Sequence, residues 1–499
     1  MAKVNTKELK KVIPGNTPVL NKAGGEGYDL DLLPRYVTML TTSFFNEKKF
    51  YGDNTQELLS TMSEVAEKDP DFYIRSLAYT RNELNMRTVP TVGVAIAARV
   101  EKTKPLVSMW APRILTRVDE LGEVIAAYRS FFGSKAMVPM SLRKGISAAL
   151  ENFNEYQLGK YEHKGGIKLV DVFNLVHPKP KTEEQNALFS KVVNGKLATP
   201  ETWETITSAS GSTKKIWEKL IDDNTMGYMA TLRNLRNILE KGVSDTHINK
   251  VCAFLSNPER VKGSKQLPFR FLSAYREVEN TGSVSITSRS KICDALAEAM
   301  KHAVNNLNLP GTTAVLADNS GSMSGANISE KSSIRYSDVA NTLAAIIMSK
   351  GGIGIVFGAT AAEIPMTRIA KADLLHVADQ ITNIDVGHST NAHEGVKLLT
   401  KTGTRVDRII LLSDMQCWNS DGFCGNRDSF RTSVEEYRQK INKDCWLHSI
   451  DLTGYGTGVM PKCAKNINLI SDWSEKVLEF IPMFEAGQDS MIDTIRRYE

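Results

Sequence analysis

The chain has 499 residues, of which 41% are hydrophobic and 24% are charged, and this composition is typical of a globular protein and excludes a disordered one. A chain of this length usually folds into two or three domains. No apolar run approaches the length that spans a bilayer, the N-terminus lacks the apolar core of a signal peptide, and the six cysteines include no C-x-x-C pair. We therefore expect a soluble, cytoplasmic protein with reduced thiols.

The net charge of +5 is divided unevenly along the chain. Residues 1–300 contain 42 Lys and Arg against 34 Asp and Glu, a balance of +8, whereas the other residues contain 20 against 23, a balance of −3. The basic surplus is compatible with a polyanionic partner for the first part of the chain. On charge alone, a solvated lysine-rich surface is the simpler explanation, because the surplus is small for 300 residues.

The first half of the sequence predicts one amphipathic helix after another. Apolar residues recur at three- and four-residue spacing, and short polar loops with proline separate the segments. The clearest helical segments are 58–66, 72–79, 92–100, 124–132 and 229–239. Helical hairpins joined by short turns favour an α-solenoid of HEAT-like repeats, although a helix bundle would show the same spacing.

Beyond Asn306, apolar runs of strand length alternate with helical segments, which predicts a parallel α/β sheet. The expected strands are 313–317, 353–357, 409–412, 446–450 and 467–470, and the expected helices lie near 334–349, 370–381, 391–400 and 432–442. The sequence thus predicts two domains, 1–295 and 306–499, with the segment 282–290 as the connection between the two halves. Ligands of such sheets bind beyond the carboxyl ends of the strands.

The first of these strands ends in an oxygen-rich D-x-S-x-S cluster that contains Asp318, Ser320 and Ser322. Thr390 lies in a second loop, before a helical segment, and Asp414 ends the apolar run of the third expected strand. Aspartate and hydroxyl side chains supply only oxygen ligands, which Mg²⁺ and Ca²⁺ prefer. The structural alternative is an aspartate that caps a helix and serines that form a turn.

These three dispersed pieces resemble the metal-ion-dependent adhesion site of von Willebrand factor A domains. The resemblance implies a divalent metal, foremost Mg²⁺, as the cofactor. Its ligands would be Asp318, Ser320, Ser322, Thr390 and Asp414, with the hydroxyls as direct ligands and the aspartates acting partly through water.

The most basic long stretch of the first half is 135–181, with eight Lys and Arg and four Asp and Glu. Lys160 and Lys164 are four residues apart, so they would share one face of a helix. A second helical stretch, 168–176, carries His177 at its carboxyl end. Aromatic rings among cations suit single-stranded nucleic acid, which stacks on rings and pairs its phosphates with cations. On spacing alone, an exposed helical hairpin with ordinary lysines is the simpler interpretation.

Three phrases of the first half resemble the TROVE family, the Ro ribonucleoproteins. They are H-P-K-P at 177–180, M-A-T-L-R-N-L at 229–235 and L-P-F-R-F-L-S-A at 267–274, and the A-type domain follows them. The resemblance covers nearly the whole chain. It implies a fold of the α plus α/β class, in which a ring of HEAT-like helical repeats is closed by a von Willebrand factor A domain. The loop at His388-Ser389-Thr390-Asn391 departs from this pattern, because a Gly-Gly-Thr-Asp form is more typical of the family.

The resemblance also implies an RNA-binding scaffold. The outer surface of the ring would bind a small noncoding Y-like RNA, and its central hole would admit the single-stranded 3′ end of structured or misfolded RNA for quality control or decay. A 3′-to-5′ exonuclease such as polynucleotide phosphorylase is a possible partner, and the expected assembly is a monomeric ring. The positions that match RNA-contacting residues are Lys160, Lys164 and His177, and Arg143 and Lys144 would extend that surface.

We expect no enzymatic activity, because the sequence contains no phosphate-binding P-loop, zinc-protease helix or nucleophile elbow. The alternative function is a magnesium-dependent protein-interaction module. In that case the A-type domain would bind an acidic protein ligand through the metal, and the helical half would serve as a platform. Arg233 lies among apolar neighbours in the sequence, so we expect a structural role for it.

Overall fold

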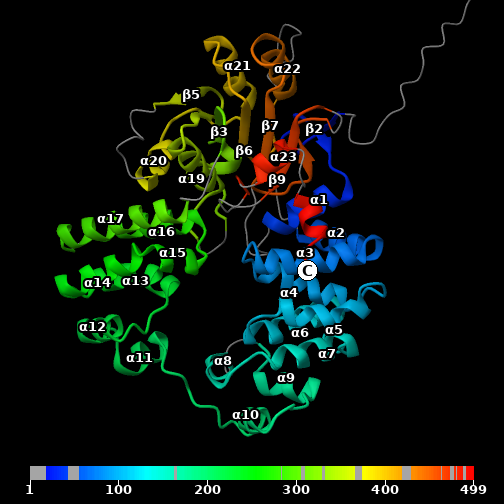
Figure 1. Cartoon of the computed structure of the whole chain (residues 1–499), viewed down its shortest axis with the longest axis vertical. Helices are drawn as coiled ribbons and strands as arrows, with labels where there is room; N and C mark the ends of the chain where they lie inside the picture. Colours follow the sequence, from blue (N-terminus) through cyan, green and yellow to red (C-terminus); the bar gives the residue numbers. More distant parts are fainter. Residues whose placement is uncertain are drawn as a thin grey trace, which may run out of the picture.

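The computed structural model describes residues 18–42, 55–161, 166–282, 284–304, 309–328, 332–365, 374–418, 429–461, 464–471, 477–478, 480–486 and 491–499. Two helical limbs and one α/β domain are arranged as a ring (Figure 1). The first limb leads away from the α/β domain, and the second limb returns to it. Within the described ranges, no helix is long and apolar enough to cross a membrane.

Each limb is a stack of short helices. The first limb contains α1 (Leu32–Thr42), α2 (Thr55–Lys68), α3 (Pro70–Asn82), α4 (Thr88–Ala97), α5 (Lys104–Ile114), α6 (Val118–Phe132), α7 (Met140–Leu150), α8 (Glu155–Tyr161), α9 (Leu169–Val176) and α10 (Glu183–Val193). The second contains α11 (Trp203–Ser210), α12 (Lys214–Asp222), α13 (Tyr228–Glu240), α14 (Asp245–Leu255), α15 (Pro258–Ser264), α16 (Pro268–Glu279) and α17 (Ile286–Ala303). Helices pack mainly against others close in sequence, as in stacked helical repeats.

Buried aromatic side chains with satisfied hydroxyls hold the first helices together. The rings of Tyr36 and Tyr73 stack with their centroids 5.9 Å apart. The Tyr36 hydroxyl lies 2.7 Å from the Ser76 hydroxyl, and the Tyr73 hydroxyl donates to the carbonyl of Gly93 at 3.0 Å. A Cβ atom at Gly93 would lie 2.4 Å from a methyl carbon of Leu77, so a larger residue there would displace the Leu77 side chain where α3 and α4 approach closely.

The α/β domain contains a six-stranded sheet of order β5-β4-β3-β6-β7-β9. Its strands are β3 (Thr313–Asp318), β4 (Ile353–Phe357), β5 (Ala361–Ile364), β6 (Arg408–Ser413), β7 (Trp446–Asp451) and β9 (Ile467–Ser471). All neighbouring pairs are parallel except β4 and β5. The helices of this part are α18 (Gly321–Ser324), α19 (Tyr336–Ser349), α20 (Leu374–Thr382), α21 (Ala392–Thr402), α22 (Phe430–Lys440), α23 (Phe480–Glu485) and α24 (Met491–Arg496).

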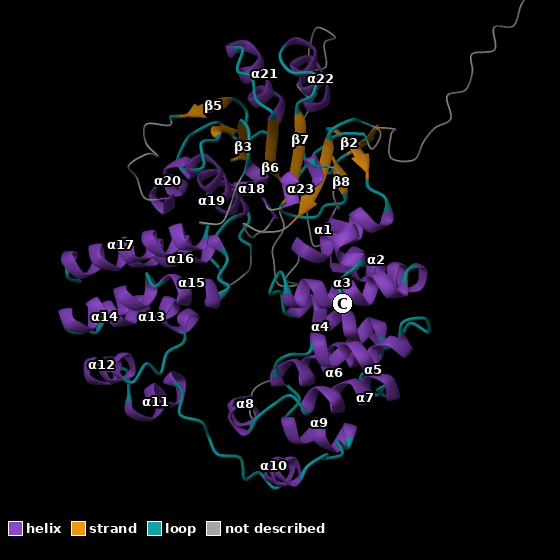
Figure 2. Cartoon of the chain, viewed as in Figure 1, coloured by secondary structure: helices purple, strands orange, loops and turns teal. Residues whose placement is uncertain are grey.

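The two faces of the sheet contribute to two different hydrophobic cores. Val315 and Ala317 belong to the core that includes α19 and α20 and continues into the helical limbs. Ala314 and Leu316, which alternate with them along β3, belong to a second core with α21 and α22. Successive side chains of a strand point to opposite faces, so the continuous apolar run at 314–317 within β3 is explained by burial on both sides. Figure 2 shows the strands confined to one end of the ring.

The helical first half and the α/β second half are confirmed, and two details of the prediction are wrong. The short edge strand β5 was not predicted, because its residues are partly exposed and form no apolar run. Asp414 therefore follows the fourth strand of this sheet and not the third. The segment 282–290 is not the connection between the halves, because α17 begins within it, where the Ser285 hydroxyl accepts a hydrogen bond from the Ser288 N–H.

The N-terminal hairpin contacts the α/β domain, and the last helix of the α/β domain contacts the first limb. The hairpin of β1 (Pro18–Leu20) and β2 (Glu26–Asp29) pairs with β8 (Thr457–Gly458) of the α/β domain. Helix α24 packs on α3, where the rings of Tyr79 and Tyr498 meet edge to face with centroids 5.5 Å apart. These contacts join the first limb to the α/β domain, as does the contact between α1 and β9, where the Thr41 and Ser471 hydroxyl oxygens lie 2.7 Å apart.

Candidate functional site

The five residues predicted to bind the metal lie at the carboxyl ends of neighbouring strands. Asp318 is the last residue of β3, and Asp414 directly follows β6, which is paired in parallel with β3. Ser320 and Ser322 follow β3 at the start of α18, and Thr390 directly precedes the N-cap residue of α21. All five residues are at most 6% exposed. The sheet topology therefore explains why residues distant in sequence share one place.

Hydrogen bonds fix the orientation of the oxygen atoms in this cluster. The Ser320 and Ser322 hydroxyl oxygens lie 3.2 Å apart, and the Ser320 N–H donates to Asp318 Oδ1 at 2.9 Å. The Ser413 hydroxyl donates to Asp318 Oδ2 at 2.5 Å. Among the described residues, Asp414 Oδ2 is buried without a hydrogen bond of good geometry. A cation would offset the cost of burying a carboxylate oxygen that lacks a well-formed hydrogen bond.

Burial raises the pKa of both carboxyl groups above the ordinary value of 3.8. The pKa of Asp318 is raised further by the negative charge of Asp414, while the neighbouring Ser322 hydroxyl partly offsets the rise in the pKa of Asp414. In the part of the chain that the structure describes, no basic side chain forms an ion pair with either group. Two buried carboxylates side by side repel each other unless a proton or a cation neutralises them.

Backbone hydrogen bonds tie the Thr390 loop to the other two loops of the cluster. The Gly321 N–H donates to the carbonyl of His388 at 2.7 Å, and the Trp418 N–H donates to the carbonyl of Thr390 at 2.8 Å. The side-chain amide nitrogen of Asn391 donates to the carbonyl of Ala359 at 3.0 Å, which ties this loop to the residues after β4. The structure therefore brings all three predicted pieces together.

Two supporting features of the cluster were not predicted from the sequence. Ser413 supplies a hydroxyl to Asp318, and its place at the end of an apolar run could have indicated this. The N-terminal hairpin covers the Asp414 loop, because the Asn21 side-chain amide donates to the carbonyl of Cys417 at 2.7 Å. A Cβ atom at Gly25 would lie 2.1 Å from that carbonyl oxygen. No local sequence signal could have identified a contact between segments almost 400 residues apart.

The residues predicted to contact RNA lie on the first limb, in a group of helices that pack together. Lys160 is half-buried on α8, with its Nζ 5.8 Å from the centroid of the Tyr161 ring. His177 is exposed and ends α9 in a left-handed conformation with a φ of 48°, and its N–H donates to the carbonyl of Phe173. Both α8 and α9 pack on α6. Lys164 lies outside the described residues.

The two weaker RNA candidates lie on α7, which packs against α9. Lys144 is exposed, whereas Arg143 is half-buried and its Nε donates to the carbonyl of Val138 at 3.1 Å. Arg143 therefore has a structural contact in addition to any contact with a ligand. The guanidinium of Arg117, which was not predicted, lies 4.9 Å from the centroid of the Tyr161 ring. Tyr161 is thus packed beside two cations of its own chain.

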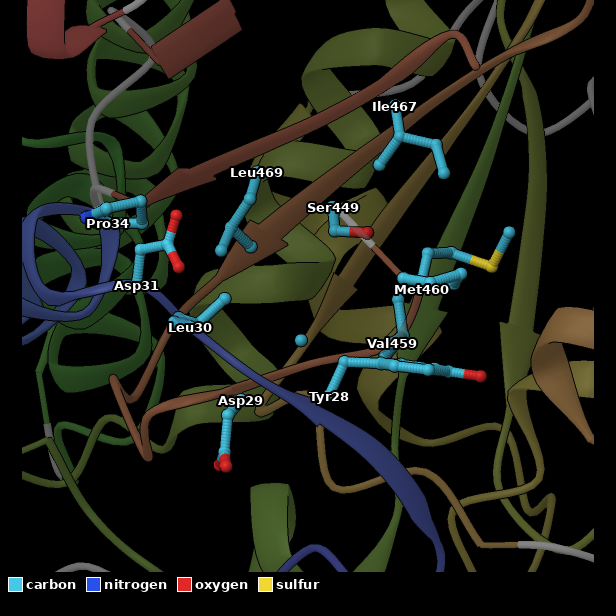
Figure 3. A pocket seen from close by; sticks show the side chains of 12 residues that line it. Tyr28, Asp29, Leu30, Asp31, Pro34, Ser449, Val459, Met460, Ile467 and Leu469 are labelled. Carbon is cyan, nitrogen blue, oxygen red and sulfur yellow. The ribbon is translucent and has the colours of Figure 1, made fainter. Parts of the chain in front are cut away.

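A small pocket beside the N-terminal hairpin has a mainly apolar lining, with Asp29, Asp31 and Ser449 among its polar residues. Its volume is about 190 Å³, and its lining includes Leu30, Val459 and Leu469. Figure 3 shows these apolar side chains at the pocket, with the carboxylate of Asp29 directed away from them. Pockets that bind small molecules usually measure about 300–1,000 Å³ and contain several convergent polar groups, so this pocket does not meet that description.

Comparison with known proteins identifies the helical part of the chain. The TROVE domain matches residues 36–195 and 192–309. Telomerase protein component 1 of Rattus norvegicus is 24% identical over 299 aligned positions, which cover 44% of this chain and 11% of that protein. The same component of Mus musculus is 25% identical over 307 positions, which cover 44% and 12%. The chain thus matches about a tenth of the length of these curated relatives.

The architecture also matches a solved structure over nearly the whole chain. The crystal structure of the Deinococcus radiodurans RO (RSR) protein superposes with a TM-score of 0.60 at 17% sequence identity, covering 92% of this chain and 99% of that one. At this identity the match shows a shared fold, which confirms the predicted helical ring with an A-type domain. Because the TROVE domain covers more than half of the residues and both helical limbs, the chain belongs to the TROVE family.

Proposed function

We propose that this protein is an RNA-binding scaffold of a ribonucleoprotein and not an enzyme. The observation that carries this proposal is the TROVE domain match across both helical limbs, together with the fold shared with a Ro protein. The exposed His177 and Lys144, with the half-buried Lys160, supply groups for phosphate contacts on the first limb. Phosphate contacts of this kind provide affinity and orientation without selecting a sequence.

The finer proposal is that the outer surface of the ring binds a small, structured Y-like RNA. The ring would admit the single-stranded 3′ end of a misfolded or structured RNA, and a 3′-to-5′ exonuclease such as polynucleotide phosphorylase would act on the RNA that the scaffold presents. His177 supports this proposal, because a ring at an exposed helix end is available both to stack on a base and to donate a hydrogen bond to a phosphate.

We expect the Lys160→Ala, Lys164→Ala, His177→Ala variant to bind a structured small RNA roughly tenfold or more weakly at physiological salt, because two or three phosphate contacts are lost. The slope of log affinity against log salt concentration should fall by about one for each contact removed. The measurement is a filter-binding titration at several salt concentrations. Its control is the Lys241→Ala, Lys262→Ala variant, which removes two exposed lysines from the second limb. Equal affinities and slopes for both variants would refute the placement of the RNA.

A second function, magnesium-dependent binding of a protein, is favoured by the buried Asp318 and Asp414 cluster. The residues fit a hard divalent cation: two carboxylates and three hydroxyls converge, and Asp414 Oδ2 is buried without a hydrogen bond of good geometry among the described residues. Ser320, Ser322 and Thr390 would hold the ion directly, and the two aspartates would balance its charge. When bound, the ion would supply a positive centre able to bind a carboxylate of an acidic protein ligand. This function is compatible with RNA binding by the limbs.

A further inference from the structure

A cavity on the second limb has a charge that its own residues do not balance. It measures about 450 Å³ and lies where α13 and α16 meet residues 332–333 of the α/β domain. Its polar lining includes Arg233, Arg236, Arg270, Glu277, Ser332 and Ser333. Its volume lies within the range of about 300–1,000 Å³ that is usual for ligand pockets.

One of the three arginines is paired within the protein. Arg236 forms an ion pair with Glu277 at 2.6 Å and a longer one with Glu240 at 3.6 Å. Across the described ranges, neither Arg233 nor Arg270 has a carboxylate within ion-pair distance. The lining therefore contains two guanidinium groups that no acidic side chain of the described chain neutralises.

The partial burial of Arg270 makes its unneutralised positive charge unfavourable. Its side chain is half-buried, and its guanidinium lies 5.1 Å from the centroid of the Phe269 ring. Burial lowers the pKa of Arg270, and the positive charge of Arg233 lowers it further. Two guanidinium groups that repel each other in a partly desolvated cavity are stabilised by a bound anion.

The position of Arg233 also differs from the sequence prediction. The apolar residues Leu232 and Leu235 of α13 are buried in the core, while Arg233 is exposed and lines the cavity. The helix therefore directs the Arg233 side chain away from its apolar sequence neighbours and away from the core. An exposed guanidinium without a partner in the described residues is available to a ligand.

The groups around the cavity are better matched to binding a phosphate than to binding a carboxylate. Guanidinium groups bind phosphate oxygens in a bidentate way, and two neighbouring ones complement its higher charge. Ser332 and Ser333 add hydroxyl donors from the α/β domain. The Ser332 hydroxyl oxygen accepts a hydrogen bond from the Ile334 N–H at 3.1 Å, which leaves its proton free to be donated.

We propose that this cavity binds a phosphate group through Arg233 and Arg270, with Ser332 and Ser333 as further donors. The phosphate belongs either to a free nucleotide or to an RNA strand. The site is separate from the Lys160 and His177 surface, because it lies on the other limb and includes residues of the α/β domain. A bound phosphate would therefore link the second limb to that domain.

The test compares the intact wild-type protein with Arg233→Gln, Arg270→Gln and the double variant, using inorganic phosphate, AMP and a short single-stranded RNA as probes. Binding is measured by calorimetry and by the shift in melting temperature. We expect the double variant to bind at least one probe roughly tenfold or more weakly than the wild type. Lys241→Gln is the matched control, because it removes one positive charge near the end of α13 but outside the cavity.

The probes separate the two sources of phosphate. Loss of AMP and phosphate binding in the double variant supports a nucleotide site, and a loss confined to the RNA supports a site for an RNA phosphate. Arg233→Gln alone remains informative if Arg270→Gln fails to fold, because Arg233 is exposed. Equal binding of all three probes by the wild type and these variants would overturn the proposal. The Lys160→Ala, His177→Ala variant should retain AMP and phosphate binding, so a failure of the proposed RNA surface would be visible separately.

Discussion

Replacing Arg276 with alanine is expected to lower the free energy of unfolding by about 3 kcal/mol, because it leaves a buried carboxylate without its cation. Arg276 extends from α16 of the second limb to the α/β domain, with its Nη1 2.9 Å from Asp338 Oδ2 and its Nε 2.7 Å from Asp379 Oδ1. The Asp338 side chain is completely buried. The loss should appear in urea unfolding of the whole chain.

The control for this prediction is Arg236→Ala, which removes an ion pair between two exposed side chains of the same limb. Exposed pairs usually contribute up to about 1 kcal/mol, so this variant should remain close to the wild type. The Arg276→Ala, Asp338→Asn double variant should be more stable than the sum of its single changes predicts, because each change removes the same interaction. If Arg276→Ala and Arg236→Ala lowered the free energy of unfolding equally, Arg276 would not hold the second limb to the α/β domain.

Adding Mg²⁺ is expected to raise the melting temperature of the protein, and the increase should be larger at pH 8 than at pH 5. The raised pKa values of Asp318 and Asp414 mean that the folded, metal-free protein binds more protons than the unfolded chain in this range. The metal-free protein is therefore most stable below the pKa that these carboxyl groups have in the unfolded chain. Its stability falls as the pH rises through the higher pKa values that they have in the folded protein. Mg²⁺ would compensate for this loss by about 2.7 kcal/mol at a hundred times its dissociation constant.

The control for the metal prediction is Asp318→Asn, which keeps the size of the side chain and removes one of the two charges. Without metal, this variant should lose less stability than the wild type between pH 5 and pH 8, since the repulsion with Asp414 is gone. It should also respond weakly to Mg²⁺. A response to Mg²⁺ as large in Asp318→Asn as in the wild type would contradict the assignment of the site.

The parts of the fold that could be predicted are those with a local signal. The strands β3 and β6 are buried on both faces, so they are continuous apolar runs that end at the cluster. The edge strand β5 has partly exposed residues and no such run. The serine-rich segment before α17 was interpreted as a connection, but Ser285 caps a helix there.

The candidate metal site was predictable because its residues follow strands whose carboxyl ends meet in a parallel sheet. The contact from the N-terminal hairpin was not, since the Asn21 amide reaches the Cys417 carbonyl from a distant segment. The ion pair between Arg276 and Asp338, which joins the second limb to the α/β domain, was not predictable for the same reason. The exposure of Arg233 follows from the spacing of Leu232, Leu235 and Leu239, which places it off the apolar face of α13, whereas the residues of the α/β domain that it meets at the cavity could not be predicted. Contacts between distant segments depend on how the ring closes, and local sequence patterns do not predict that.

The central claim is that the first limb holds RNA, and the most direct measurement is the sequencing of RNA that co-purifies with the protein from its native host. The wild type should enrich one or a few small structured RNAs. A folded Lys160→Ala, Lys164→Ala, His177→Ala variant should lose this enrichment. RNA recovery at background level for the wild type and the variant alike would contradict the ribonucleoprotein function.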